Sequence, residues 1–449
     1  MKARKIFTRV LVILLAVLAA VLLLRAVLNY TTGKQLESYL AKAKAEGVAF
    51  RMRELVPDCP DLDNGALIWK AAEPFVRAEI SGIRPMPWNA ANDIIYFWGP
   101  IDAATKAAFV PLLEMNRKAF ELMAEAAAKP CFVYKDWNDP AYIGRTMNAV
   151  TMIRLTKLLA VDAVFRADAG DLKGALERCR AGMDFTRKAL GDAPYQISCL
   201  VALADMKICL AGLNRVLSGR QVEPAVLADW IRELDPRPWR AQFDRWVSGE
   251  RALLFELFLD IINAVPDAMD STTSFGQVRN RIYYWLLRPV IKSELVWTQR
   301  HLERLQGYVD QPYFQVREKL IQQSREAVAL PWYYKAVGSF LPEFHAAAMK
   351  EASLESRMLA TRAGLACKIF KSKTGHYPTN LEALVPEILP EVPIDPFTGK
   401  PFVFKIQDGE LLIYSLGSNQ KDDGGRMSPQ TQLVMEKDDD WTWRERIDR

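Results

Sequence analysis

Residues 1–30 constrain this chain most, because they contain an apolar run too long to leave exposed to water. The stretch 10–24 has no charged residue, and Arg25 alone interrupts an apolar character that continues to residue 28. With Arg9 and Arg25 extending outward to the headgroups, the segment 6–28 reaches about 20 residues, enough for a helix to cross a bilayer. The sequence therefore predicts a transmembrane anchor over residues 1–30.

The charges that flank this run predict its orientation. Cytoplasmic flanks of membrane helices are enriched in lysine and arginine, so the N-terminus is expected in the cytoplasm and the body on the extracytoplasmic side. A cleaved signal peptide is the alternative, but Leu-Leu-Leu-Arg at residues 22–25 stands where a small-x-small cleavage site would be needed. No second stretch approaches spanning length, so an uncleaved single-pass anchor is expected. The basic residues ahead of the run are Lys2, Arg4, Lys5 and Arg9.

Composition narrows the class of the remaining chain. The chain has 449 residues, of which 50% are hydrophobic and 25% charged, as in globular proteins rather than disordered ones. The formal net charge of +5 is small for this length, and no basic stretch is interleaved with aromatic residues as in a stacking groove. A dedicated nucleic-acid binder is therefore not expected.

The cysteines do not form a metal-binding pattern, because none stand in C-x-x-C spacing. Cys199 and Cys209 are expected on one helix, about 15 Å apart along its axis and beyond disulfide reach. A pair between Cys179 and either of them stays open, and buried free thiols are the favoured interpretation. The six are Cys59, Cys131, Cys179, Cys199, Cys209 and Cys367.

Residues 31–340 are expected to form an irregular multi-helix extracytoplasmic domain. Apolar residues recur at helical spacing, for example at Ala149, Met152, Leu155, Leu159 and Ala163. In the segment 163–185, a glycine-containing turn and small residues resemble one helix–turn–helix of a tetratricopeptide repeat, in which small residues let paired helices approach closely. No second copy follows at the repeat period.

The segment 280–309, "NRIYYWLLRPVIKSELVWTQRHLERLQGYV", combines aromatic with basic residues. Exposed, it would be a partner or membrane-surface patch; buried, it would be part of the helical core. Core packing is the favoured interpretation.

The segment 375–402, "GHYPTNLEALVPEILPEVPIDPFTGKPF", changes the character of the chain, since its prolines and glycines break helices and specify turns. A helix precedes it, and two β-rich runs at 402–404 and 411–414 follow, with glycines at tight turns. In this order the elements of residues 341–449 resemble the C-terminal domain of the major pseudopilin of bacterial type II secretion. The resemblance implies a small α+β module that is expected to fold independently.

The predicted fold class is therefore mainly α, with an anchor at 1–30, a helical domain at 31–340 and a pseudopilin-like module at 341–449. A pseudopilin continues its N-terminal anchor directly into the module's helix, carries a glycine where this chain has Ile6, and has a glutamate in its apolar run. Because the chain departs from all three features, a filament subunit is not expected.

The sequence and the resemblance together favour a membrane-anchored, non-enzymatic binding or scaffolding protein of the bacterial cell envelope. It is expected in the inner membrane, with a protein partner on the helical domain. One alternative is an accessory component of a type II secretion-like apparatus, and another is an envelope hydrolase with its site between helices. No phosphate-binding loop, dinucleotide fingerprint, H-E-x-x-H or G-x-S-x-G motif occurs, so no catalytic or cofactor-binding residue is predicted.

The resemblance also implies a calcium site, because the pseudopilin holds calcium in the loop after its last strand. Asn419 stands where the pseudopilin has an aspartate, and Asp438 and Asp439 correspond to its adjacent aspartates before a tryptophan. Asp422 and Asp423 form an alternative pair in a glycine-rich turn. Calcium prefers six to eight hard oxygens, which clustered carboxylates and loop carbonyls supply. A solvated acidic tail is the alternative.

If calcium binds there, millimolar calcium should raise the melting temperature of the protein, because a ligand that binds only the folded state stabilises it. The double substitution Asp438→Ala with Asp439→Ala should abolish the rise. A wild-type melting curve that calcium leaves unmoved would mean that these residues hold no calcium.

Overall fold

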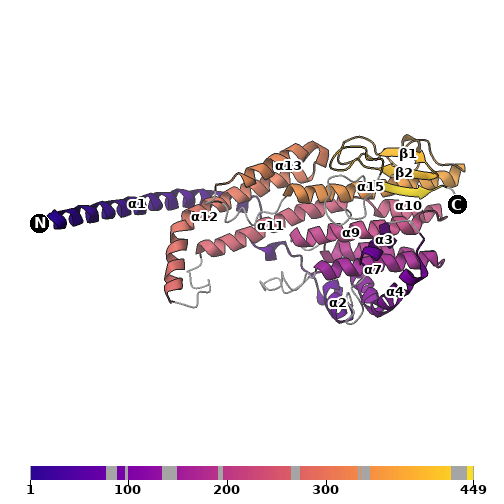
Figure 1. The fold of residues 1–449 in the computed structure, drawn as a ribbon, viewed down its shortest axis with the longest axis horizontal. Helices are drawn as coiled ribbons and strands as arrows, with labels where there is room; N and C mark the ends of the chain where they lie inside the picture. The colour runs from indigo at the N-terminus through magenta and orange to yellow at the C-terminus, as the bar shows by residue number, and fades with distance from the viewer. Residues whose placement is uncertain are drawn as a thin grey trace. The chain divides into compact units, whose positions relative to one another are not determined.

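The computed structural model of the protein describes residues 2–76, 88–96, 100–133, 149–190, 196–263, 274–331, 334, 344–425 and 442–447. Over these residues the fold is mainly helical, with one small sheet near the C-terminus (Figure 1). The helices are α1 (Lys2–Ala45), α2 (Gly65–Ala72), α3 (Trp88–Tyr96), α4 (Ala103–Met115), α5 (Arg117–Ala128), α7 (Ala149–Asp168), α8 (Leu172–Phe185), α9 (Gln196–Leu217), α10 (Pro224–Glu233), α11 (Arg237–Asn263), α12 (Ser274–Val309), α13 (Tyr313–Val328) and α15 (Phe344–Thr374).

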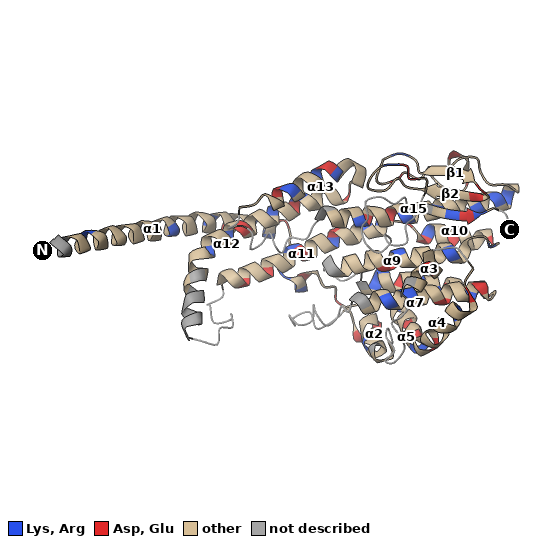
Figure 2. Cartoon of the chain, viewed as in Figure 1, with Lys and Arg blue, Asp and Glu red and all other residues tan. Residues whose placement is uncertain are grey.

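The apolar run lies in α1, which is one uninterrupted helix from Lys2 to Ala45. Its large apolar side chains between Ile6 and Leu28 are exposed. Figure 2 shows this stretch almost free of charge. Within the described residues, no other helix is both long and apolar enough to cross a membrane. The structure thus contains a candidate membrane anchor where the sequence predicts one, although a signal sequence would have the same length and composition.

Packing divides the chain into two compact units, and the first comprises Met1–Leu55, Val247–Gly307 and Gln322–Pro342. Here the second half of α1 has a buried face, formed by Leu36, Tyr39 and Ala43. The ring of Phe255 in α11 lies 6.3 Å from that of Tyr39, between ring centroids. The same helix that exposes its apolar first half therefore packs into a protein core with its second half.

The second unit comprises Val56–Trp246, Tyr308–Ile321 and Glu343–Arg449, and it has one continuous hydrophobic core. The predicted stripe on α7 is confirmed for Met152, Leu155, Leu159 and Ala163, which are all buried, while the side chain of Ala149 lies outside the described residues. The α7–α8 hairpin turns at Gly170, whose φ of +88° is a left-handed conformation that glycine adopts without strain.

Small residues let these helices approach closely, as the sequence predicts. A Cβ on Gly182 of α8 would lie 2.9 Å from Leu159 of α7 and 3.0 Å from the sulfur of Cys209 of α9. A larger side chain at this position would therefore push α8 away from both of its neighbours.

One disulfide, between Cys59 and Cys131, is present in the second unit, with 6.2 Å between the Cα atoms. Beside it, the amide of the buried Asn64 donates to the carbonyl of Val133 (2.6 Å) and accepts from its N–H (2.9 Å). The expectation of free thiols is wrong for this pair, since 72 residues separate the two cysteines and only the packing of α2 on α5 brings their segments together. Cys179, Cys199, Cys209 and Cys367 are free thiols, so the alternative pairs with Cys179 are not formed.

The C-terminal residues form a helix followed by a three-stranded antiparallel sheet, β1 (Val403–Gln407), β2 (Glu410–Tyr414) and β3 (Thr442–Arg446), in the order β1-β2-β3. Asp408 and Gly409 join β1 to β2 with φ values of +52° and +72°, which are typical of a two-residue Asp-Gly hairpin turn. The "DPFTG" turn before β1 is organised by the buried Asp395, which accepts hydrogen bonds from the N–H of Phe397 (3.0 Å) and the hydroxyl of Ser415 (2.8 Å).

This C-terminal part shares its core with the helical residues before it. α15 packs against α9 and α10 on one side and against β2 and β3 on another. The buried ammonium of Lys368 lies 2.6 Å from Glu445 of β3 and donates to the carbonyl of Arg220 after α9 (3.0 Å). Glu445 also accepts from the N–H of Gly219 (3.1 Å). The shared core differs from the expectation of an independent module, because the sheet covers only part of the apolar surface of α15.

A close approach between α15 and the sheet makes this arrangement testable. A Cβ on Gly364 would lie 2.2 Å from the indole of the fully buried Trp443. Gly364→Ala should therefore destabilise the protein by about 1–3 kcal/mol in denaturant unfolding, as overpacking a core does. Gly307→Ala in α12 is the control, because a Cβ there meets nothing within 4 Å. It should be neutral or stabilising by up to about 1 kcal/mol. Equal stability of the two variants would contradict the close packing of Trp443.

Candidate functional site

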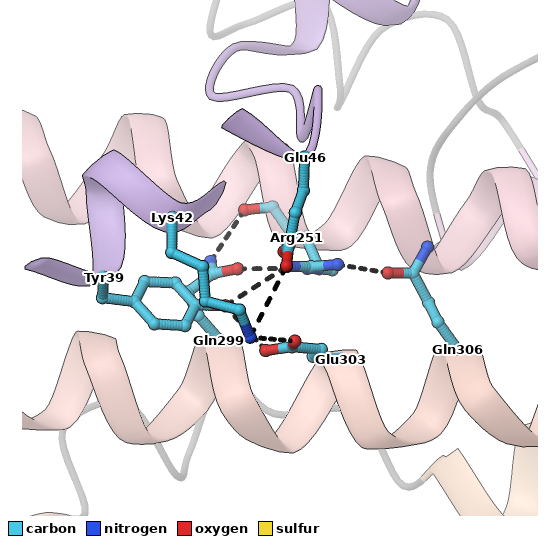
Figure 3. Close-up of polar contacts among 7 residues, drawn as sticks. All are labelled: Tyr39, Lys42, Glu46, Arg251, Gln299, Glu303 and Gln306. Atoms are coloured by element: carbon cyan, nitrogen blue, oxygen red, sulfur yellow. Dashed lines mark hydrogen bonds and ion pairs between the residues drawn. The ribbon is translucent and has the colours of Figure 1, made fainter. Parts of the chain in front are cut away.

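The second half of α1 is attached to α11 and α12 by a polar cluster, shown in Figure 3. Arg251 of α11, whose side chain is buried, is at its centre. Its guanidinium donates to the hydroxyl of Tyr39 in α1 (3.2 Å) and to the amide oxygens of Gln299 (3.4 Å) and Gln306 in α12. One arginine thus joins α1 to two consecutive helices from a distant part of the sequence.

The side chains that accept from Arg251 make further hydrogen bonds of their own. The amide of Gln299 donates to the backbone carbonyl of Arg251 (2.9 Å). Glu303 accepts from Tyr39 (3.3 Å) and forms an ion pair with Lys42 of α1 (3.0 Å), which also lies 3.7 Å from Glu46. A buried guanidinium is costly unless each N–H finds an acceptor, so this network specifies one position of α1 along the other two helices. The arrangement binds and orients a helix and brings no nucleophile or metal ligand set together.

A second cluster, in the core of the second unit, consists of ionisable side chains on α3, α7 and α9. Asp205 of α9 is fully buried, and burial raises the pKa of its carboxyl to about 8, although Thr156 and Lys157 of α7 oppose the shift. Burial likewise lowers the pKa of Lys157 to about 8 and raises that of Tyr96 in α3 to about 12. With a pKa of about 8, Asp205 is mostly protonated at neutral pH, so the core holds a neutral carboxylic acid at this position.

A third group lies where α15 faces the start of α11. Arg240 of α11 donates to Glu355 (2.5 Å), which is one helical turn from Glu351 on α15. Burial, together with the like charge of Glu355, raises the pKa of Glu351 to about 8. Burial lowers the pKa of Lys207 on α9 well below its usual value. Perturbed pKa values of this kind are found at functional sites and also in structural ion-pair networks.

The size of the cavity beside Glu351 helps to decide whether this group is a functional site or a structural ion-pair network. It is lined by the aromatic side chains of Trp239, Phe243 and Trp246, with Cys199 and Gln242 at its wall. Its volume is about 10 Å³, room for about one water molecule. The Glu351 group therefore borders a space for water rather than for an organic substrate.

The predicted calcium ligands are only partly described. The amide of Asn419 donates to Asp423 (2.9 Å). Asp422 instead accepts from the hydroxyl of Tyr414 (2.8 Å) and pairs with Lys405 (3.1 Å), so it faces a cation of the protein itself. Asp438 and Asp439 lie outside the described residues.

Among the residues that the structure does describe, no group of three or more His, Cys, Asp or Glu side chains is placed to hold a metal ion. Calcium binding by the full predicted set stays a prediction.

Among the side chains that the structure describes, no histidine is combined with these carboxyl groups; the side chain of His345 lies outside them. His301 is buried in the first unit, stacked on Trp297 with 4.9 Å between ring centroids, and burial lowers its pKa to about 4. His376 is exposed in the turn after α15, where its Nδ1 lies 3.0 Å from the carbonyl of Tyr377. His376 therefore contacts the backbone of the turn in which it lies.

The sequence contains a signal for the buried ionisable residues, although they form no known motif. Asp205 and Lys207 interrupt the apolar helix "CLVALADMKICLAGL", and Lys157 interrupts "MIRLTKLLAVDAVF". A charged residue within an apolar helical stripe has to be buried or to displace the stripe. Arg251, in contrast, stands in the mixed segment "SGERALLFEL", where nothing distinguishes it from a surface arginine.

Comparison of the chain with protein-family models, with curated proteins and with solved structures finds no match. The function is therefore inferred from the geometry and the sequence.

The raised pKa of Asp205 predicts a pH dependence of stability. The unfolded carboxyl titrates near its usual pKa of about 4, whereas the folded one titrates at about 8. Between these values the folded state binds more protons than the unfolded state, so this group's contribution to stability falls as the pH rises, by at most about 1.4 kcal/mol per pH unit.

Asp205→Asn removes this dependence. The melting temperature of the wild type minus that of the variant should therefore decrease steadily from pH 5 to pH 8. A difference that is constant across this range would show that Asp205 ionises normally in the folded protein.

Proposed function

We propose that this chain is a single-pass membrane-anchored protein of the bacterial cell envelope whose body acts outside the cytoplasm as a non-enzymatic scaffold or binding protein. The observation that carries the proposal is the continuity of α1. One helix contains both the exposed apolar run and the face that Arg251 and its partners hold in the folded first unit. Such a helix transmits the position of the anchor to the body without a flexible linker.

The same continuity favours an anchor over a cleaved signal. The residues just after the apolar run are helical, and Leu36, Tyr39 and Ala43 already belong to the packed core. Removal of the apolar run by a peptidase would need the start of the folded unit to unwind.

Two observations support an extracytoplasmic body. The basic residues stand before the apolar run, which places them on the cytoplasmic side. The Cys59–Cys131 disulfide is of the kind that persists in oxidising compartments and is rare in the cytoplasm.

A binding or scaffolding role, rather than hydrolysis, is supported by the character of the buried carboxyl groups. Asp205 is enclosed by the core, and the cavity beside Glu351 has room for about one water molecule. Both groups are placed to specify how helices pack. The partner surface that we propose is the helical domain of residues 31–340.

An accessory component of a type II secretion-like apparatus is the second candidate. It is supported by the order of elements in residues 344–446, a long helix, a short turn and an antiparallel hairpin, which is the order that the pseudopilin resemblance implies. Co-purification of secretion components with the full chain would favour this candidate over a general scaffold.

Reporter fusions test the orientation of the anchor, and the intact mass of the purified protein tests whether the anchor is retained. A reporter that works only outside the cytoplasm should be active when fused after Arg449 and inactive when fused before Met1, and the purified protein should retain residues 1–30 by intact mass. Activity of the N-terminal fusion alone would reverse the orientation. A mature chain that starts after the apolar run would show a cleaved signal instead.

A further inference from the structure

The start of α12 has the composition of a membrane-surface helix. Between residues 274 and 293 the sequence contains four basic residues and no acidic one, together with several aromatic and aliphatic residues. Interfacial helices combine such a basic character with an apolar face that reaches the boundary between headgroups and acyl chains. The basic residues are Arg279, Arg281, Arg288 and Lys292.

An apolar face of this segment is exposed. The side chains of Ile282, Trp285 and Leu286 retain 54%, 43% and 44% of their accessible surface. Their spacing of three and four residues puts them on one side of the helix. Residues 275 and 278, which continue the same spacing, are phenylalanine and valine. Core packing, the interpretation that the sequence favours for 280–309, therefore holds for the buried Leu295 and Leu302 and not for this face.

Pro289 explains how this face is tied to the anchor. A proline inside a helix has no N–H to donate to the carbonyl four residues earlier, which here is that of Trp285. That carbonyl accepts two hydrogen bonds from the guanidinium of Arg25 instead, at 3.1 and 2.8 Å. The guanidinium carbon also lies 3.3 Å from the centre of the Trp285 ring, in a cation–π contact.

The contact between Arg25 and Trp285 places the exposed face of α12 at the headgroup level of the proposed bilayer. Arg25 ends the uncharged run of α1, where an arginine extends to the headgroups. Further along both helices, the ammonium of Lys292 donates to the side chain of Asn29 (3.1 Å). From Trp285 onward α12 therefore follows α1 out of the apolar region. Figure 1 shows the first part of α12 at a steep angle to the rest of the helix.

We propose that residues 274–288 of α12 lie in the headgroup layer of the bilayer as an interfacial helix, with the Ile282–Trp285–Leu286 face toward the acyl chains. The occupant of this face is the lipid surface, because the face starts where the spanning segment ends and its flanking charges match anionic headgroups. This inference rests on the proposed anchor. With a second membrane contact beside α1, the first unit cannot rotate freely about the anchor axis.

The test uses the full chain, one copy per nanodisc, in a mixture of phosphatidylglycerol and phosphatidylethanolamine. A nitroxide label is placed on a cysteine at position 282 or 286, and its collisions with oxygen are compared with those with a water-soluble nickel chelate. Leu18 and Glu37 are the reference positions on α1, because both are exposed. They lie about 10 Å before and about 18 Å after Arg25 along the helix.

The oxygen-to-nickel ratio at 282 and 286 should be several-fold above that at 37 and approach that at 18. Ratios equal to that at 37, with a lipid-like ratio at 18, would overturn the interfacial helix and leave the anchor standing. A label at 18 that behaves like the one at 37 would overturn both. Labels at 282 and 286 that are shielded from oxygen and nickel alike would mean that protein covers the face, which also overturns the proposal.

A charge substitution gives an independent arm. Ile282→Glu should lower the ratio at position 286 toward that at 37, because a carboxylate opposes immersion of the face among acyl chains. Val328→Glu is the matched control, since Val328 is another exposed aliphatic residue of the first unit, at 79%. It should leave the ratio unchanged. An unchanged ratio in Ile282→Glu would show that this face does not enter the bilayer.

Discussion

In the first unit, the packing of α1 on α11 and α12 depends on one buried guanidinium, that of Arg251. Arg251 is almost fully enclosed, so its N–H groups must find acceptors within the protein, and they do so on α1 and α12. Without Tyr39 or Gln299, a buried cation would lose acceptors in a low-dielectric core, which is far more costly than the loss of a surface ion pair. The position of α1 against the body therefore depends on satisfying this single charge.

The second unit depends instead on one hydrophobic core, which the helices and the C-terminal sheet share. The helix α15 contributes one side to α9 and α10 and another to the sheet. The buried pair of Lys368 and Glu445 ties that sheet to the turn after α9. The pseudopilin resemblance covers only the C-terminal residues and therefore suggests a module that folds by itself. In the structure, the hydrophobic core of these residues continues into the preceding helices.

Features that depend on neighbouring residues could be predicted from the sequence, whereas contacts between distant segments could not. The apolar N-terminal helix, the α7 stripe and the Asp-Gly hairpin follow from local patterns, which act over a few residues and need no knowledge of the remaining chain. The Cys59–Cys131 disulfide and the acceptors of Arg251 join segments from distant parts of the sequence. No local pattern encodes such partners, and the same residue types occur on ordinary surfaces.

The sequence by itself determined that the chain has one long apolar helix near its N-terminus, a helical body and a turn-rich end with a small sheet. Hydrophobic periodicity, proline and glycine act through the local backbone and leave a readable signal. Only the tertiary structure decided which charged residues are buried, which cysteines pair and which face of α12 stays exposed. Those outcomes depend on which surfaces exclude water from one another, and this is a property of the packed chain as a whole.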